Sequence, residues 1–129
     1  MSRRYLSVSE AQNALSRGKS IEAFIGSCCR DNSKGIKWAS IRYRNDTFIT
    51  SIYETADLGD EDYLDIYSFG PLNPELDYEE ADLEFKYSSF ESTLSYLELQ
   101  FPGLSKKLVN EFVIQDEYKD YIIRGRCDT

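Results

Sequence analysis

The chain has 129 residues, of which 41% are hydrophobic and 14% aromatic, and its formal net charge is −8. This length matches one ordinary domain with a single core, and the apolar content argues against disorder, so we expect one domain over residues 1–129. No segment approaches the roughly eighteen apolar residues of a membrane-spanning helix, and the start of the chain lacks the apolar run of a signal peptide. We therefore expect a cytoplasmic protein that does not bind membranes.

The first predicted element is a helix that begins near Ser7 and ends by Gly18. Ser7 and Glu10 have the spacing of a capping box, and apolar residues follow at helical intervals. In the next segment, residues 20–30, the apolar residues fit a short helix and an extended strand equally well. A turn is expected over residues 31–35.

Residues 37–44 and 47–54 predict a β-hairpin, because two β-rich runs flank Asn45 and Asp46, which tolerate the left-handed conformations of a tight turn. A two-residue turn determines the register of the pairing. The expected pairs are Tyr43 with Phe48, Ile41 with Thr50, Ala39 with Ile52, Trp38 with Tyr53, and Lys37 with Glu54. One face then carries Ala39, Ile41, Tyr43, Phe48 and Ile52, and the other carries Trp38, Arg42, Ile49 and Tyr53.

The face that carries Trp38 and Tyr53 is too apolar to be left bare, so something must cover it. Two covers are possible. The carboxyl-terminal helices can pack on this face, or a partner protein can complete the part of it near Tyr63 and Tyr67.

Residues 63–69 alternate as a third strand, with Leu64 and Ile66 toward the core and Tyr63, Asp65, Tyr67 and Phe69 on the other side. Gly70 and Pro71 end this strand, because proline cannot donate to a β-ladder. Residues 82–87 alternate again and could form a fourth strand at the edge of the sheet.

The sequence changes to helical spacing at Ser88, which stands three residues before Glu91 as in a capping box. Residues 101–103, Phe-Pro-Gly, end that helix. Two more helices are expected, one carrying Leu104, Leu108 and Phe112 on one face, and a short last one carrying Ile114, Tyr118 and Ile122. The sum is an α+β fold: an N-terminal helix, a three- to four-stranded antiparallel meander, and C-terminal helices packed on the sheet.

The residue types argue against an enzyme. The chain has no histidine, the commonest general base and metal ligand, and its glycines are scattered singly rather than gathered in a phosphate-binding loop. Cys28 and Cys29 lack the spacing of a redox or zinc motif, and with Cys127 they predict inert thiols in a reducing compartment. The acids of residues 57–62 do not match a calcium loop, because Gly59 precedes the cluster. We expect no metal and no cofactor.

The most unusual feature is a segment with charges of one sign. Residues 45–85 contain thirteen carboxylates and no lysine or arginine, whereas the rest of the chain has ten acids and fifteen bases. Such a segment creates a field that repels nucleic acid and attracts a cationic partner. The carboxylates are Asp46, Glu54, Asp57, Asp60, Glu61, Asp62, Asp65, Glu75, Asp77, Glu79, Glu80, Asp82 and Glu84.

We predict that one part of this segment binds a partner protein. Tyrosines interleaved with carboxylates combine apolar contact area with charge, and the two are densest where the loop over residues 57–62 enters the predicted third strand. Residues 75–82 are expected to form a solvated rim. The predicted partner-binding residues are Asp57, Asp60, Glu61, Asp62, Tyr63, Asp65 and Tyr67.

In size, charge and layout the chain resembles the immunity proteins of bacterial toxin/immunity pairs, including those of contact-dependent growth inhibition. The stretches that carry the resemblance are residues 59–69 (GDEDYLDIYSF) and 113–122 (VIQDEYKDYI). The resemblance implies a non-catalytic cytosolic inhibitor of a cognate toxin domain, commonly a basic nuclease. Two alternatives remain: an acidic adaptor or nucleic-acid mimic that binds a basic partner, and a carboxylate- or metal-dependent enzyme.

Overall fold

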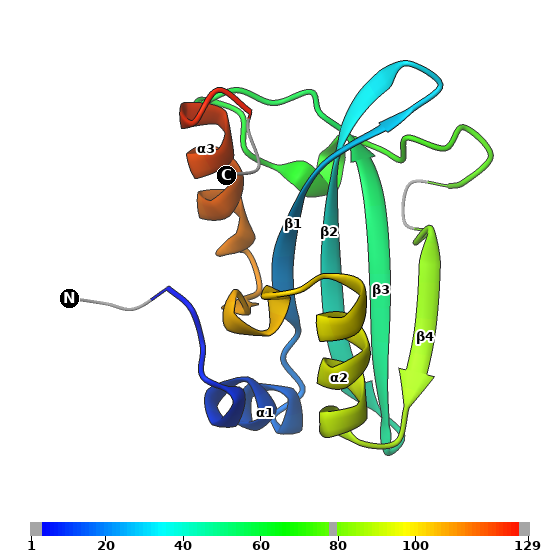
Figure 1. The fold of residues 1–129 in the computed structure, drawn as a ribbon, viewed down its shortest axis with the longest axis vertical. Helices are drawn as coiled ribbons and strands as arrows, with labels where there is room; N and C mark the ends of the chain where they lie inside the picture. The colour runs from blue at the N-terminus through cyan, green and yellow to red at the C-terminus, as the bar shows by residue number, and fades with distance from the viewer. Residues whose placement is uncertain (1–3, 78–79, 127–129) are drawn as a thin grey trace.

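The computed structural model describes residues 4–77 and 80–126. It has an α+β fold built on a five-stranded antiparallel sheet with the order β4-β3-β2-β1-β5 (Figure 1). The α+β class is therefore confirmed, with one strand more than expected. The helices and strands are α1 (Val8–Ser16), β1 (Ile21–Arg30), β2 (Ser33–Arg44), β3 (Thr47–Ala56), β4 (Leu83–Tyr87), α2 (Phe90–Gln100), β5 (Val109–Asn110) and α3 (Ile114–Ile123), with 3₁₀ turns η1 (Ile66–Ser68) and η2 (Leu104–Lys106).

Helix α1 begins with the predicted capping box. The Ser7 hydroxyl accepts a hydrogen bond from the Glu10 N–H (3.1 Å), and the Glu10 carboxylate accepts one from the Ser7 N–H (2.8 Å). These bonds satisfy backbone groups that a helix start leaves unpaired. Gly18, with a φ of +83°, follows the end of the helix as expected.

Within residues 20–30, which the sequence left open between helix and strand, Ile21–Arg30 form strand β1. It pairs with β2 through a two-residue turn at Asp31 and Asn32, whose φ angles of 51° and 70° are left-handed. The predicted turn over residues 31–35 is thus too long, since β2 already begins at Ser33. Asparagine and aspartate tolerate this conformation better than most residues, so a tight turn suffices to join the strands.

The hairpin of β2 and β3 has the predicted register in all five expected pairs, from Tyr43 with Phe48 to Lys37 with Glu54. Asn45 and Asp46 form its turn, both with positive φ. The pairing reaches further than expected, to Gly35 with Ala56. Local turn chemistry and side-chain alternation therefore suffice to place these two strands.

The predicted third strand over residues 63–69 is wrong. This part of the chain forms a loop that contains the 3₁₀ turn η1, and residues three apart in such a turn lie on the same side. Ile66 and Phe69 are accordingly both buried, although strand alternation had placed them on opposite faces. The strand that pairs next to β3 is β4, which the sequence placed correctly at the edge.

The C-terminal region differs from expectation at two points. Helix α2 is capped by Ser89, whose hydroxyl accepts from the Ser92 N–H (3.1 Å), so the cap lies one residue after the predicted cap, Ser88. The expected helix through Leu104, Leu108 and Phe112 is wrong, because the chain after η2 extends and pairs as β5 with β1. The last predicted helix is present as α3.

The sheet separates two apolar clusters. On one face, α1 and α2 pack against Ala39, Ile41 and Ile52 of the hairpin. On the other face, α3 and the loop that follows β3 cover Phe24 and Trp38. The first of the two predicted covers is therefore present, because the C-terminal helix α3 packs on the face that carries Trp38. No helix in the described part of the chain is both long and apolar enough to cross a membrane.

Candidate partner-binding surface

The carboxylates of residues 45–85 fall into two groups in the folded chain. Leaving aside Glu79, which lies outside the described residues, one group forms ion pairs with bases from outside the segment, and the other group has no such base among the described residues. The ion-paired carboxylates are Glu54 with Lys37 (3.1 Å), Asp57 with Arg126 (2.6 Å), and Glu84 with Arg42 (3.4 Å). The charge of the segment is therefore partly neutralised by tertiary structure.

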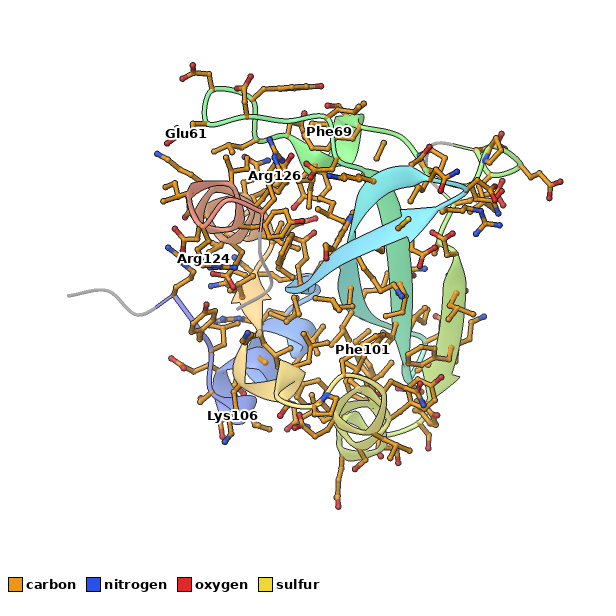
Figure 2. All side chains as sticks on the ribbon, turned by 45° about the horizontal axis from the view of Figure 1, so that its top comes forward. Glu61, Phe69, Phe101, Lys106, Arg124 and Arg126 are labelled. Atoms are coloured by element: carbon orange, nitrogen blue, oxygen red, sulfur yellow. The ribbon has the colours of Figure 1, made fainter. Side chains whose placement is uncertain are left out.

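The unpaired group is densest in the loop between β3 and η1. We call this the acidic tip, made of Asp60, Glu61, Asp62, Tyr63 and Asp65. All five are exposed, Tyr63 to 45%. Within residues 4–77 and 80–126, none of its four carboxylates has a base within 4.0 Å. Figure 2 shows Glu61 at the outer edge of this loop.

The acidic tip is a small closed turn. The N–H groups of Asp60 and Tyr63 each donate to the other residue's carbonyl, at 3.1 and 3.0 Å. The Asp62 N–H donates to the Asp60 carboxylate (2.8 Å), and the Tyr63 and Ser68 hydroxyls lie 2.5 Å apart. These bonds order the backbone of the turn and the Asp60 carboxylate, so the tip has a defined conformation by itself.

Gly59 allows the chain to pass closely over two aromatic rings. A Cβ atom here would lie 2.4 Å from the Tyr63 carbonyl oxygen and 2.6 Å from ring carbons of both Phe69 and Tyr118. The Gly59 N–H instead donates to the Tyr118 hydroxyl at 2.9 Å. Only glycine fits this approach without moving the backbone, so the residue fixes the distance between the acidic tip and the core.

A polar network ties the base of the loop to α3 and to the residues after it. The Tyr118 hydroxyl donates to the buried Asp57 carboxylate, and Arg126 donates to the same carboxylate (2.6 Å) and to the Gly59 carbonyl (2.7 Å). Burial, followed by the bond to Asp57, raises the pKa of Tyr118 to about 12, so its hydroxyl remains a proton donor. In Figure 2, Arg126 lies inside this loop.

Two of the predicted partner-binding residues do not belong to the exposed surface. The Asp57 carboxylate is only 5% exposed and pairs with Arg126. Tyr67, predicted to point outward from a strand, is half-buried in the second cluster, with its hydroxyl donating to Glu22 at 2.6 Å. The 3₁₀ turn is the physical reason, since it turns Tyr67 away from the side that carries Asp65.

Glu22 is a buried acid with no base beside it among the described residues. It lies on β1, is 3% exposed, and accepts from the Tyr67 hydroxyl and from the Phe112 N–H (3.0 Å). Burial raises the pKa of Glu22 above its ordinary value, although both hydrogen bonds act in the opposite direction. This carboxylate joins the loop after β3 to the chain before α3.

Sequence reasoning missed the residues that support the acidic tip. In the sequence, Gly59 stands out as a departure from a calcium loop and as the start of a stretch that resembles immunity proteins, Tyr118 stands out as an apolar residue of a helix, and Arg126 does not stand out. Tyr118 belongs to the second stretch that resembles immunity proteins, but nothing in its spacing indicates that it meets Asp57. Asp57 and Tyr118 are 61 residues apart in sequence, and only the folding of the chain brings them into contact.

The described part of the chain shows neither a cluster of metal ligands nor an activated thiol at Cys28. No group of three potential metal ligands occurs within the described residues, so the acids of residues 57–62 do not gather around one point. Burial raises the pKa of Cys28 to about 11, which keeps that thiol protonated and a poor nucleophile. Cys127 lies outside the described residues.

Comparison with known proteins assigns this chain to no group: no protein-family model, no curated protein and no solved structure matches it.

Proposed function

We propose that this protein is a non-catalytic binding protein, and specifically an immunity protein that neutralises a cognate, basic, nuclease-like bacterial toxin domain. The observation that supports this most directly is the acidic tip, where four exposed and unpaired carboxylates are held on a loop anchored in the core. A solvated face would not require that support. Carboxylates held in place beside an exposed tyrosine suit recognition of a basic surface.

The physical mechanism is competition by charge. A nuclease binds the phosphates of its substrate in a basic groove, and fixed carboxylates can occupy such a groove in their place. Opposite charges also steer the two proteins together, which raises the association rate and makes it sensitive to salt. We expect the association rate to fall steeply between about 50 and 500 mM salt, because the screening length shortens over this range.

The partner is tested genetically and then kinetically. An immunity gene lies next to its toxin gene, so the product of the neighbouring gene is expressed with and without this protein, and survival of the cells is measured. We expect toxicity alone and protection on co-expression. Absence of toxicity, or toxicity that this protein leaves unchanged, would contradict an immunity function. A basic partner without toxicity would instead indicate an adaptor.

The surface is tested by matched charge reversals. The double variant Glu61→Lys/Asp62→Lys and the control Glu75→Lys/Asp77→Lys change the net charge equally and alter exposed side chains of the same segment. At low salt we expect the first variant to slow association with the partner roughly tenfold and the control to slow it much less. Equal losses in stopped-flow measurements would mean that general charge, and not the acidic tip, binds the partner.

A further inference from the structure

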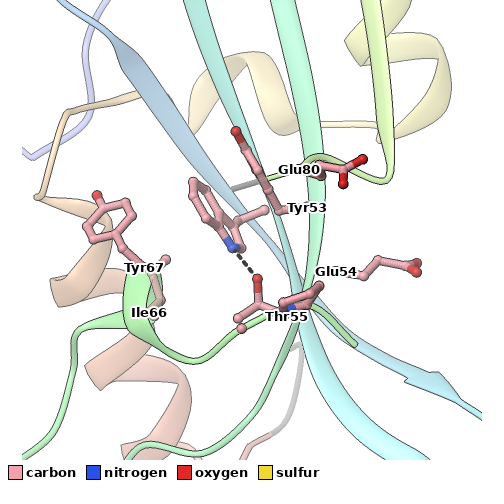
Figure 3. A pocket seen from close by; sticks show the side chains of 9 residues that line it. Tyr53, Glu54, Thr55, Ile66, Tyr67 and Glu80 are labelled. Atoms are coloured by element: carbon pink, nitrogen blue, oxygen red, sulfur yellow. Dashed lines mark hydrogen bonds between the residues drawn. The ribbon is translucent and has the colours of Figure 1, made fainter. Parts of the chain in front are cut away.

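A cavity of about 180 Å³ lies between strands β2 and β3 and the loop that follows β3, where Ile66 and Tyr67 of that loop line it. Figure 3 shows its lining as sticks, with the Trp38 indole N–H donating to the Thr55 hydroxyl at 3.0 Å. Small-molecule sites usually measure about 300–1,000 Å³, so this cavity has room for one side chain rather than for a cofactor. Its principal lining residues are Trp38, Tyr53, Thr55, Ile66, Tyr67 and Glu80.

Three aromatic rings, those of Trp38, Tyr53 and Tyr67, line this cavity. The Tyr53 ring stacks on Trp38 with centroids 4.4 Å apart, and Tyr67 meets Trp38 edge to face at 5.5 Å. Phe112 extends the row outward, packing edge to face on Tyr67 at 5.6 Å while 62% exposed. The rings therefore continue from the cavity to the protein surface. Exposed aromatic area next to a cavity is typical of the anchor points of protein interfaces.

The backbone holds Phe112 in this exposed position against its own preference. Its φ of +77° is a costly conformation for a bulky residue. The Phe112 N–H donates to the buried Glu22 carboxylate (3.0 Å) and approaches the Tyr67 hydroxyl (3.2 Å), which compensates part of that cost. Strained residues of this kind cluster at binding sites.

The charge around the cavity is negative. Among the described residues, Glu54 and Glu80 are the only lining residues with carboxylate or basic side chains, and Glu54 pairs with Lys37. In Figure 3 the Glu54 side chain points away from the aromatic rings, and Glu80 is seen at the edge of the cavity, on the side of Tyr53 opposite to Tyr67. No base in the described part of the chain lies within 4.0 Å of Glu80. A cation that entered would meet aromatic rings and, at the rim, the Glu80 carboxylate, one oxygen of which already accepts a hydrogen bond from the Asp77 N–H at 3.0 Å.

We propose that this cavity is an anchor site for an arginine side chain of the basic partner. A planar guanidinium stacks on aromatic rings and can bond a carboxylate at the same time, which lysine and apolar side chains do less well. The inference rests on the proposed function: the acidic tip attracts the partner, and the aromatic cavity holds one of its arginines. The two sites share one loop, since Ile66 and Tyr67 follow Asp65 directly.

Binding can be followed by intrinsic fluorescence, because Trp38 is the single tryptophan of the chain and lines the cavity. Indole fluorescence is followed while N-acetyl-arginine amide is added at constant ionic strength, with the amides of N-acetyl-citrulline and N-acetyl-norleucine as neutral ligands of similar shape. We expect a saturable change with the arginine derivative and at least threefold weaker binding of either neutral ligand. The variant Glu80→Gln should weaken arginine binding about threefold, as expected for a partly exposed charge pair.

The control variant is Glu91→Gln, an exposed acid in the first turn of α2, which should leave the midpoint unchanged. Equal binding of arginine and norleucine derivatives would overturn the proposal in favour of an apolar anchor site. A fluorescence signal that does not saturate, or equal effects of the two glutamine variants, would also overturn it. The proposed function has a separate readout, since the charge reversals at Glu61 and Asp62 are measured with the partner itself.

Discussion

The acidic segment contains two loops that are both rich in carboxylates but differ in how they contact the rest of the protein. Residues 57–70 bury Ile66 and Phe69 in the second cluster and connect to Tyr118 and Arg126 through hydrogen bonds. Residues 71–82 bury no described side chain, and their bonds to the rest of the protein go to β3 alone, from the two ends of the loop. Between those ends the described bonds are local turns.

This difference separates a supported surface from a solvated connection. A loop whose apolar and polar contacts reach the core presents its outer side chains in one arrangement, and residues 57–70 have such contacts. Residues 71–77 and 80–82 carry acids too, but the described hydrogen bonds of their carboxylates go to neighbours in the loop or to β3, and of their described acids only Glu80 lines the aromatic cavity. Equal charge density therefore does not imply equal function, and the variants below test the contrast.

The largest expected effect is that of Gly59→Ala. The added methyl group would meet the Tyr63 carbonyl and the rings of Phe69 and Tyr118, so backbone or core must shift. We expect a loss of about 1–3 kcal/mol in the free energy of unfolding, measured by urea denaturation. The control Asp77→Ala, an exposed residue of the second loop, should change it by less than about 0.5 kcal/mol. If the two variants lost a comparable free energy of unfolding, the first loop would not be better supported by the core than the second.

The variant Arg126→Ala tests the polar support of the acidic tip. It leaves the buried Asp57 carboxylate without its base and the Gly59 carbonyl without a donor. We expect a cost of about 1–2 kcal/mol, because Arg126 itself is partly exposed. Arg42→Ala breaks a longer pair with the exposed Glu84 and should cost about 0–1 kcal/mol. If the two variants lose the same stability, the network at Asp57 has no special role.

The variant Glu22→Gln tests the buried carboxylate that holds Tyr67. Because burial raises the pKa of Glu22, the folded state retains this proton longer than the unfolded state does. The resulting stabilisation is complete below the ordinary glutamate pKa and is lost as the pH rises through the raised value. Glutamine can accept both hydrogen bonds without charge. We therefore expect the stability of the variant, relative to the parent, to increase between about pH 4 and pH 7.

A constant difference between the two proteins over that range would show that Glu22 does not titrate with folding. Urea denaturation at several pH values measures it directly. The comparison with the parent matters, because 23 acids contribute to the pH dependence of the whole chain.

The smallest effect on stability is expected for Glu61→Lys/Asp62→Lys. Both side chains are exposed, and the bonds that close the tip use the Asp60 carboxylate and the backbone instead. We expect a change of less than about 0.5 kcal/mol, measured by urea denaturation. A slower association with the partner would then be a surface effect and not a folding defect. A large destabilisation would mean that these acids support the loop themselves.

Much of the fold follows from local patterns. The capping box at Ser7, the turn at Asn45 and Asp46 and the register of the hairpin all depend on neighbours close in sequence. The same reasoning failed for residues 63–69 and 104–112. Their alternation or helical spacing is real, but pairing with β1 and packing on α3 decide their conformation.

The sequence by itself determined the α+β class, the pairing of β2 with β3 and the one-signed charge of residues 45–85. Only the tertiary structure decided which of those charges remain free, because Lys37, Arg42 and Arg126 reach their carboxylates through contacts between distant segments. It also decided that Tyr67 lies beside a buried glutamate rather than at the surface. Charge composition is a property of the chain, whereas the exposure and pairing of each charge depend on packing.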